Sequence, residues 1–265
     1  MWRWVQVTTW CLAIFFASTI TSRVEPDNIV EAAVILPYEL TYVISSQRVK
    51  IILEMAIERY QYLLPGKKIV LQYYDDGCKA EDSLKQAFKA LDPMSRKCHI
   101  MFGPTCEFAT AMVGRLLKFF TVPLLTTGAL THDFMKNKTR RDDEFFGVVR
   151  LSPSNFITIA RSINALNAKF NWTRFVMLYK PDGQQEVSGE GTCKLMMETL
   201  VESFKSITTK MVYRAVNMDR LNDTKKILLE EIGVDYSGMR RVTVEMPCLS
   251  HSFCSVLVIR NSSSP

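Results

Sequence analysis

Few side chains in this chain could perform acid–base, metal or nucleophilic chemistry. Its three histidines are His99, His132 and His251, and only His251 has partners at a spacing suited to metal ligands, Cys248 and Cys254. A structural zinc site needs about four ligands, and two thiols in an oxidising compartment favour a disulfide over thiolate ligands. The chain also contains no Gly-x-Ser-x-Gly nucleophile turn and no Walker phosphate loop. We therefore expect no catalytic residue, no metal and no organic cofactor, and the sequence disfavours an extracellular enzyme.

Two short segments place acidic, glycine and cysteine residues where ligands of α/β proteins collect. Residues 75–78 (Asp-Asp-Gly-Cys) follow one apolar run, and residues 103–106 (Gly-Pro-Thr-Cys) follow another and precede an amphipathic stretch. The carboxyl ends of parallel strands meet at one edge of a sheet, and the free N–H groups at a helix start can bind an anion. Cys106 could also reach Cys78, in which case a disulfide would join the two segments without any ligand.

These segments belong to a regular alternation of short apolar runs and longer amphipathic stretches. Strands are expected at residues 29–37, 68–74, 100–102, 122–125, 145–151, 174–179, 209–216 and 255–259. Helices are expected at 49–64, 81–91, 106–119, 155–170 with Ser154 as the cap, 192–204 and 220–231, whereas residues 233–253 have no clean period. The first helix carries its apolar residues on one stripe, which indicates a face packed against a sheet: Val49, Ile52, Leu53, Ala56, Ile57, Tyr60 and Leu64.

Repeated strand–helix units of this length predict an α/β fold of mainly parallel sheets covered by helices. We expect a first lobe at residues 29–150 and part of a second lobe at residues 151–265. The last expected strand has no helix after it, so one face of the second sheet would lack its cover. Our interpretation of the sequence is that the second lobe is incomplete and that the chain is a truncated product.

The first 22 residues have the order of a secretory signal. Arg3 supplies a positive start, a mostly apolar run extends from Val5 to Ile20, and small and polar residues follow it. The run is too short and too interrupted for the roughly 20 apolar residues of a membrane span, and no later stretch reaches 18. We therefore expect the secretory pathway, with a membrane reached only through a C-terminal part that this sequence lacks.

Glycosylation motifs and cysteines agree with export. Asn-x-Ser/Thr triplets stand at Asn137, Asn171, Asn222 and Asn261. Six cysteines remain once Cys11 leaves with the signal, and an even number in an oxidising compartment predicts disulfides, although six cysteines allow 15 pairings.

The charge pattern argues against nucleic acid as a partner. The formal charge of +6 comes from mixed signs, because the basic residues at 136–141 are followed at once by Asp142, Asp143 and Glu144. A nucleic-acid surface would interleave basic residues with stacking aromatics, and this segment instead predicts a solvated loop.

Several motifs occur in a specific order along the chain. The most specific is FGPTCEFATAMVGRLLKFFTVPLLTTGALTHDF at residues 102–134. Less specific ones are Leu63-Leu64-Pro65-Gly66, Asp75-Asp76-Gly77-Cys78, NWTRFVMLY at 171–179 and VLVIRNSSSP at 256–265. In this order they resemble the extracellular ligand-binding region of natriuretic peptide receptors and related receptor guanylate cyclases. The resemblance spans residues 29–263 and covers about the first half of such a region.

This resemblance implies two lobes of the type I periplasmic-binding-protein kind, a homodimer formed through the extracellular region, and a peptide hormone or other extracellular ligand. Full-length relatives of the cyclase type continue through a membrane span into kinase-like and guanylate cyclase domains, whose catalytic residues are not in this sequence. We expect a receptor segment without enzymatic activity. The alternative is a soluble secreted protein that sequesters a ligand and lacks a signalling domain.

The resemblance also implies roles for individual residues. Cys78 and Cys106 match the first disulfide of the family, whereas the family partner of Cys193 lies beyond this sequence, so Cys193 is free, pairs with Cys98, Cys248 or Cys254, or bridges to another molecule. Phe108, Arg115 and Tyr179 fall where the family contacts its peptide. The simpler interpretation makes Phe108 and Tyr179 ordinary core or rim aromatics and Arg115 a solvated helix residue. The strand with Val212, Tyr213 and Arg214 matches another contact strand but differs in residue types, which leaves the ligand open.

An anion site is the last expectation from the resemblance. The family binds chloride through backbone N–H groups that match Thr105 and Cys106 and through a serine hydroxyl whose place Asp76 takes here. A carboxylate repels chloride, so we hypothesise that Asp76 itself occupies the anion position at the helix start and makes ligand binding independent of chloride.

Overall fold

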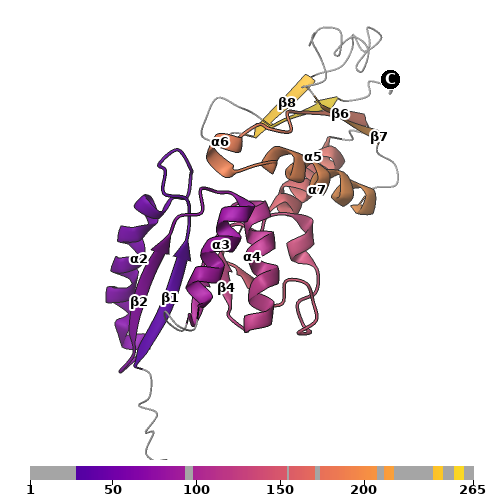
Figure 1. Ribbon diagram of the computed structural model, residues 1–265. Coiled ribbons are helices and arrows are strands. Elements are labelled where there is room, and N and C mark those ends of the chain that lie inside the picture. Colours follow the sequence, from indigo (N-terminus) through magenta and orange to yellow (C-terminus); the bar gives the residue numbers. More distant parts are fainter. Residues whose placement is uncertain are drawn as a thin grey trace, which may run out of the picture.

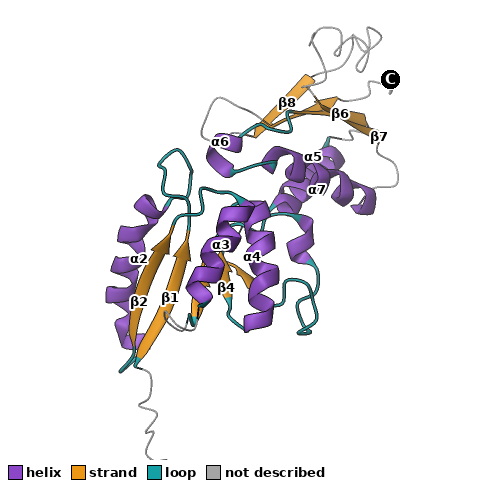
Figure 2. Ribbon diagram, viewed as in Figure 1, coloured by secondary structure: helices purple, strands orange, loops and turns teal. Residues whose placement is uncertain are grey.

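The computed structural model has two α/β lobes, each with its own sheet and helices (Figure 1). The structure describes residues 28–92, 98–153, 155–170, 174–207, 212–217, 241–246 and 254–259. In Figure 2 the strands of the first lobe lie beside helices on both sides, and the second lobe stands above the end of the sheet to which these strands point. The loops at that end of the first sheet therefore face the second lobe.

The first sheet is parallel throughout, as the sequence predicts. Its strands are β1 (Ile29–Ile35), β2 (Lys68–Tyr74), β3 (Ile100–Phe102), β4 (Leu124–Thr126) and β5 (Val148–Arg150), in the order β2-β1-β3-β4-β5. The central strands are mostly apolar because helices cover both faces of such a sheet. Val34, Ile35, Met101 and Leu124 are accordingly fully buried.

The helices of the first lobe follow the strands in alternation. They are α2 (Ser46–Tyr60), the 3₁₀ turn η1 (Gln61–Leu63), α3 (Ala80–Leu91), α4 (Glu107–Phe120) and the 3₁₀ turn η2 (His132–Met135). Helices α3 and α4 contact each other, and Ala87, Ala90, Val113 and Leu117 pack with β3 and β4 into the core. The packing of α4 against α3 and the sheet places the start of α4 at the carboxyl ends of the strands.

The prediction that the apolar stripe of α2 packs on the sheet is wrong for part of that stripe. Val49, Leu53, Ala56 and Ile57 are half-buried, but Ile52 is 66% and Tyr60 49% exposed. Leu64, beyond the helix, is 41% exposed. The apolar residues span too wide an arc for one sheet face, so α2 presents a second apolar side to solvent.

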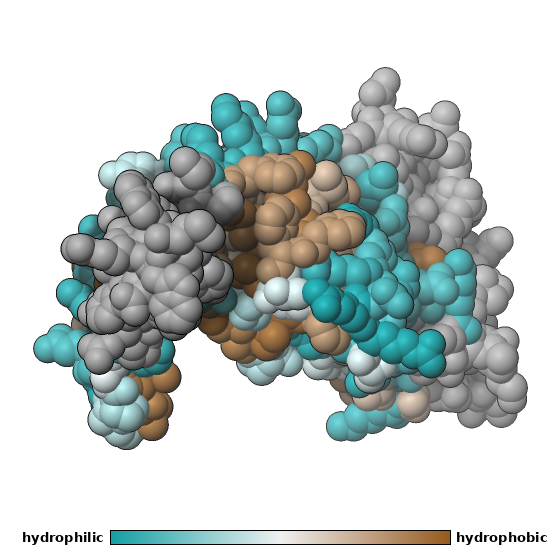
Figure 3. Space-filling view, turned by 60° about the horizontal axis from the view of Figure 1, so that its bottom comes forward, coloured by the Kyte–Doolittle hydropathy of each residue, from teal (hydrophilic) through white to brown (hydrophobic). Residues whose placement is uncertain are grey.

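The first lobe also exposes several other large apolar side chains. Ile51 and Met55 on α2 are each 64% exposed, and Phe119 at the end of α4 is 80% exposed. Figure 3, which brings the lower end of the first lobe forward, shows a hydrophobic area bordered by polar surface. Contiguous apolar surface of this kind is typical of proteins that associate with a partner.

The second lobe has a mixed sheet. Its strands are β6 (Arg174–Tyr179), β7 (Val212–Asn217), β8 (Arg241–Met246) and β9 (Cys254–Ile259), in the order β7-β6-β9-β8. β6 and β7 are parallel, as expected, whereas β9 runs antiparallel to both β6 and β8. The prediction of a parallel sheet is therefore wrong for β8 and β9, since an antiparallel partner depends on how the chain returns to the sheet and not on residue types. The sequence analysis also missed β8, although its residues alternate between polar and apolar, because the longer segment at 233–253 was judged as a whole.

Three helices of the second lobe are described, α5 (Phe156–Lys169), α6 (Gln185–Ser188) and α7 (Thr192–Ile207). Asn155, rather than the expected Ser154, caps α5, since its side chain accepts a hydrogen bond from the Thr158 N–H at 2.8 Å. α5 and α7 pack against each other over a separate core that includes Phe156, Ile163, Met177, Leu200 and Phe204.

Several sequence predictions lie outside the described residues. These are the signal at 1–22, the helix at 220–231, and three of the four glycosylation motifs, at Asn171, Asn222 and Asn261. Asn137 is described and is exposed in the loop after η2. Within the described part of the chain, no helix is long and apolar enough to cross a membrane.

Candidate functional site

The candidate site lies where the loops at the carboxyl ends of β1 to β4 meet the second lobe. Cys78, after β2, and Cys106, after β3, form a disulfide with a Cα–Cα distance of 5.6 Å, which confirms the predicted pairing. Both cysteines are buried, and Cys78 has a φ of 58° after Gly77 at 52°. Glycine tolerates this left-handed backbone, which lets the loop turn back toward α4. The disulfide therefore fixes the start of α4 beside the loop before α3.

Asp76 is fully buried beside this disulfide. Its carboxylate accepts hydrogen bonds from the Cys78 N–H and the Ser83 hydroxyl, each at 3.0 Å, and burial raises the pKa of the carboxyl group. Cys78 lies in the loop before α3, and Ser83 lies in the first turn of α3. They differ from the expected ones, the N–H groups of Thr105 and Cys106 at the start of α4.

Glu107 is a second buried carboxyl group, in the first turn of α4. The Leu130 N–H donates to both of its carboxylate oxygens at 2.9 and 3.0 Å, and the Thr131 N–H donates to one of them at 3.3 Å. Only 4% of the residue is exposed, and burial raises the pKa of Glu107 to about 7, against the opposing effect of these hydrogen bonds and of the Arg150 charge. Its charge state therefore changes near neutral pH.

A cavity of about 320 Å³ opens between the lobes above Glu107. Its walls are mainly apolar, with hydroxyl groups and the Glu107 carboxyl group at intervals. The first lobe contributes Tyr42, Val43, Ile44, Thr105, Cys106, Glu107, Thr127, Gly128 and Leu130, and the second contributes Phe156, Val187, Ser188 and Thr192. A concave, largely apolar space with a few polar groups is the usual form of a small-ligand site.

The second lobe approaches the disulfide closely. A side-chain carbon on Gly189 would lie 3.0 Å from Cys106 Cβ, and one on Gly191 would lie 2.9 Å from Phe108 Cε2. The Val43 N–H also donates to the Val187 carbonyl at 3.1 Å. Glycines are required at these two positions because the loop before α7 passes directly over the start of α4.

Phe108 stands at the rim of this contact. It is 42% exposed and lies next to Gly191, so it adjoins both lobes and solvent. The simpler interpretation allowed a core or a rim position for Phe108, and the structure gives the rim.

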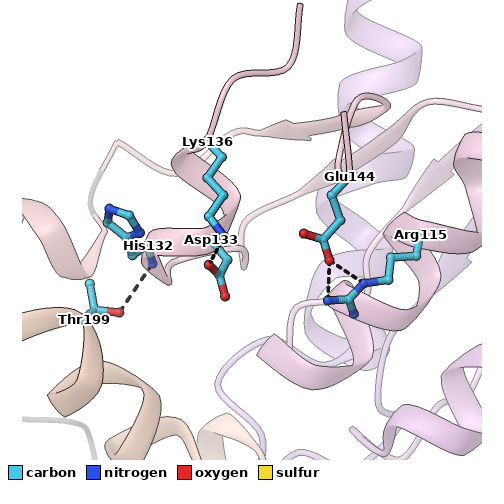
Figure 4. Close-up of polar contacts among 6 residues, drawn as sticks. All are labelled: Arg115, His132, Asp133, Lys136, Glu144 and Thr199. Carbon is cyan, nitrogen blue, oxygen red and sulfur yellow. Dashed lines mark hydrogen bonds and ion pairs between the residues drawn. The ribbon is translucent and has the colours of Figure 1, made fainter. Parts of the chain in front are cut away.

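Arg115, two turns further along α4, is engaged within the first lobe. Its Nε and Nη2 contact one carboxylate oxygen of Glu144 at 2.7 and 2.6 Å (Figure 4), and its guanidinium lies 5.1 Å from the centre of the Phe145 ring. Both members of the ion pair are about half exposed, so a ligand carboxylate would have to compete with Glu144 for the guanidinium.

Tyr179, at the end of β6, is half-buried and packs against the core of the second lobe. The three residues that the resemblance implied therefore have different surroundings: the rim for Phe108, an ion pair for Arg115, and core packing for Tyr179. Val212, Tyr213 and Arg214 lie in β7, which pairs with β6 in parallel.

The remaining cysteines are partly assigned. Cys193 is disulfide-bonded, whereas Cys98 is a free, half-buried thiol whose pKa is raised by burial. This excludes a free Cys193 and its pairing with Cys98. Among the described residues, no group of three or more histidine, cysteine or acidic side chains could hold a metal ion.

The sequence analysis missed Glu107, Leu130 and Phe156 as parts of the site. A carboxylate in the first turn of a helix is a common stabilising feature and gave no reason to single out Glu107. Its partner is a backbone N–H more than twenty residues away, which leaves no trace in residue types.

Comparisons with known proteins agree with this geometry. Residues 49–234 match a family model described as the receptor family ligand binding region. Atrial natriuretic peptide receptor 3 of Rattus norvegicus is 26% identical over 222 residues, which cover 81% of this chain and 39% of that protein. For the receptor of the same name from Homo sapiens the values are 24% over 241 residues, 88% and 42%. Atrial natriuretic peptide receptor 2 of Homo sapiens is 28% identical over 153 residues, 56% of this chain and 14% of that protein.

The chain thus spans about two fifths of the length of the first of these relatives. Among solved structures, an ABC transporter substrate-binding protein from Desulfitobacterium hafniense superposes with a TM-score of 0.56 at 16% identity, over 77% of this chain and 54% of its own. A structure from the same organism described as a complex with Leu gives 0.55 at 17% identity, over 79% and 56%. These similarities show the expected two-lobed fold of the type I periplasmic-binding-protein kind.

Proposed function

The chain belongs to the family defined by the receptor family ligand binding region, and from that premise we propose that it binds an extracellular peptide for a cell-surface receptor of the natriuretic peptide type. The observation that carries this proposal is the family match over residues 49–234. The relatives named as atrial natriuretic peptide receptors support the peptide class of ligand. In such a receptor this region lies outside the cell and performs no catalysis.

The rim of the cavity is the proposed place of peptide contact. Phe108 adjoins both lobes and is 42% exposed, so a peptide side chain could cover it and touch the second lobe at the same time. Exposed aromatic residues beside a concave surface are common anchors in protein interfaces. Arg115 lies on the same helix and supplies a cation for an acidic group of the peptide, in exchange for Glu144.

The test is peptide binding to the complete exported chain, with Phe108→Ala as the variant and Phe119→Ala as its matched control. Both phenylalanines are on α4, but Phe119 lies at the opposite end and is 80% exposed. Loss of a contacting aromatic costs about 2 kcal/mol or more, so we expect Phe108→Ala to weaken binding of a labelled natriuretic peptide at least about 30-fold. Fluorescence anisotropy gives the dissociation constants.

Phe119→Ala should bind the peptide as the unchanged chain does. If neither variant alters the affinity of a chain that binds, the rim is not the contact surface. If the unchanged chain binds no natriuretic peptide, the proposed ligand class is wrong.

A homodimer through the exposed side of α2 is the proposed assembly. Ile51, Ile52 and Met55 are each more than 60% exposed on one helix. The charged residues of α2 are of both signs (Arg48, Lys50 and Arg59 with Glu54 and Glu58), so a second copy would meet complementary charges rather than a field of one sign. A two-fold interface uses the same surface on both copies, and a self-complementary apolar helix face meets that requirement.

A further inference from the structure

The second lobe is held to the first through a short segment at residues 129–132, which we call the contact segment. Leu130 takes part in both lobes, because its N–H donates to the Glu107 carboxylate on α4 and its carbonyl accepts from the Phe156 N–H at the start of α5, at 3.0 Å. The Leu130 side chain packs against the core of the second lobe. Two hydrogen bonds on one residue thus connect α4 to α5.

The next residues extend this connection. The Thr131 N–H also donates to Glu107, and the His132 N–H donates to the Thr199 hydroxyl of α7 at 3.4 Å (Figure 4). The side of the segment toward the first lobe is therefore held by Glu107, and the side toward the second lobe reaches both α5 and α7. Glu107, Leu130 and Phe156 also line the cavity, so this connection forms part of its wall.

We propose that Glu107 is the latch between the two lobes, and that the charge on its carboxyl group sets how firmly the contact segment, and through it α5, is coupled to the first lobe. Glu107 acts here as a positioning residue for the cavity wall. The proposal does not depend on the identity of the ligand.

The surroundings of Glu107 determine the direction of the effect. Arg150 on β5 is the charged group whose field acts on it, Tyr42 shares the cavity from the first lobe, and His132 is the last residue of the contact segment. From the second lobe, the side chains beside it in the cavity are uncharged, such as Phe156 and Thr192. Burial is therefore the main influence on Glu107, and it disfavours the charged form.

The sign follows from linkage. In the coupled state the pKa of Glu107 is about 7, and when the contact segment opens and water reaches the carboxyl group the pKa returns toward its ordinary value of 4.5. The state with the higher pKa is favoured as pH falls, so coupling is firm at acidic pH and is lost progressively as pH rises through about 7. An uncharged carboxyl group still offers Leu130 an acceptor oxygen, and it avoids a buried charge.

Amide hydrogen exchange of the complete chain, measured by NMR at pH 5.5 and pH 8.0, tests the latch. After correction for the intrinsic effect of pH on exchange, the protection of the Leu130, Thr131 and Phe156 amides should be roughly 10- to 30-fold greater at pH 5.5. In Glu107→Gln, which is neutral at every pH, the protection of these amides should be high and the same at both pH values.

The Cys78 amide supplies the matched control. It donates to Asp76, another buried carboxyl group of the same lobe that does not touch the contact segment in its described hydrogen bonds. Glu107→Gln should leave Cys78 protection unchanged, and Asp76→Asn should change Cys78 while leaving Leu130, Thr131 and Phe156 as they are. Unchanged protection at Cys78 also shows that the first lobe of the Glu107→Gln variant is folded.

Two results would overturn the proposal. One is a pH effect on Leu130 and Thr131 that Phe156 does not share, since the coupling would then stop before α5. The other is a pH effect that persists in Glu107→Gln. If that variant does not fold, the unchanged chain decides alone: the corrected protection of the Leu130 and Phe156 amides should fall as pH rises above 4.5 and level off above about pH 7. No ligand is present in these measurements, so their failure is distinct from failure of the proposed peptide binding.

Discussion

At the scale of single residues, Asp76 stands where the family resemblance implies a serine. This carboxylate accepts hydrogen bonds from the Cys78 N–H before α3 and from the Ser83 hydroxyl within it, rather than from the N–H groups of Thr105 and Cys106. The charge nevertheless lies in the loop that the Cys78–Cys106 disulfide holds against the start of α4. A carboxyl group in this loop competes electrostatically with any free anion there, since like charges in a buried region repel strongly.

The prediction at this scale concerns chloride. We expect peptide affinity to stay within about twofold when sodium chloride is replaced by sodium gluconate at constant ionic strength, because Asp76 disfavours a chloride ion. Asp76→Ser introduces the serine hydroxyl that the resemblance implies at this position. In this variant, chloride should increase the affinity for the peptide. Isothermal titration calorimetry in the two salts measures both. Peptide binding that disappears from the unchanged chain in gluconate would contradict this prediction.

At the scale of elements, the periodic pattern of α2 predicted the helix correctly but not which of its apolar residues are buried. The helix forms where the pattern predicts it, but its apolar residues cover more than the side that meets the sheet. Burial of Val49, Leu53 and Ile57 is only partial, while Ile52 and Met55 are exposed. An apolar side of this kind is stable in water only at a cost, which association with a second copy would remove.

The prediction for α2 is that Ile52→Glu weakens self-association. A charge at a residue that is buried in the dimer should raise the dimer dissociation constant at least about tenfold, because an unpaired buried charge costs several kcal/mol. Sedimentation velocity across a range of concentrations gives that constant. Leu166→Glu is the control, since Leu166 is 39% exposed on α5 in the other lobe. If both variants associate as the unchanged chain does, or the unchanged chain is monomeric throughout, α2 is not the interface.

At the scale of the whole molecule, two separate hydrophobic cores meet at a polar junction. The first core surrounds β3, β4, α3 and α4, and the second surrounds β6, α5 and α7. Between them lie the disulfide, the two buried carboxyl groups and the cavity. Because each lobe has its own hydrophobic core, each can keep its structure while the contacts at the junction change.

The prediction for the junction concerns the disulfide between Cys78 and Cys106. Replacing both cysteines by alanine should lower the free energy of unfolding of the first lobe by about 3 to 4 kcal/mol, since the disulfide closes a loop with a sequence separation of 28. Hydrogen exchange of β1 and β3 amides under mild denaturant reports this loss, and amides of α5 and α7 should be affected less. Cys98→Ala is the control, because Cys98 is a free thiol. An equal loss in both lobes would show that they unfold as one unit.

Residue types and their periodicity were sufficient to predict most of the helices and strands. All five strands of the first sheet, its parallel direction and the Cys78–Cys106 pairing were predicted, the last from the family resemblance. β8 was not predicted, although its six residues alternate between polar and apolar, because the segment around it shows no such pattern. The direction of β9 depends on which strand it pairs with. The exposed side of α2 was missed for the same reason: burial is a property of the neighbours that a helix finds.

The sequence by itself therefore determined the α/β class, the order of strand–helix units and the family, since these follow from local periodicity and from motifs read along the chain. Only the tertiary structure decided which groups share the junction. Three of its contacts join segments that are distant in the sequence. The Leu130 N–H donates to Glu107, the Phe156 N–H donates to the Leu130 carbonyl, and Gly191 contacts Phe108. The first two involve backbone groups. Backbone N–H and C=O groups are the same in every residue but proline, so their pairing across a fold is invisible until the chain is folded.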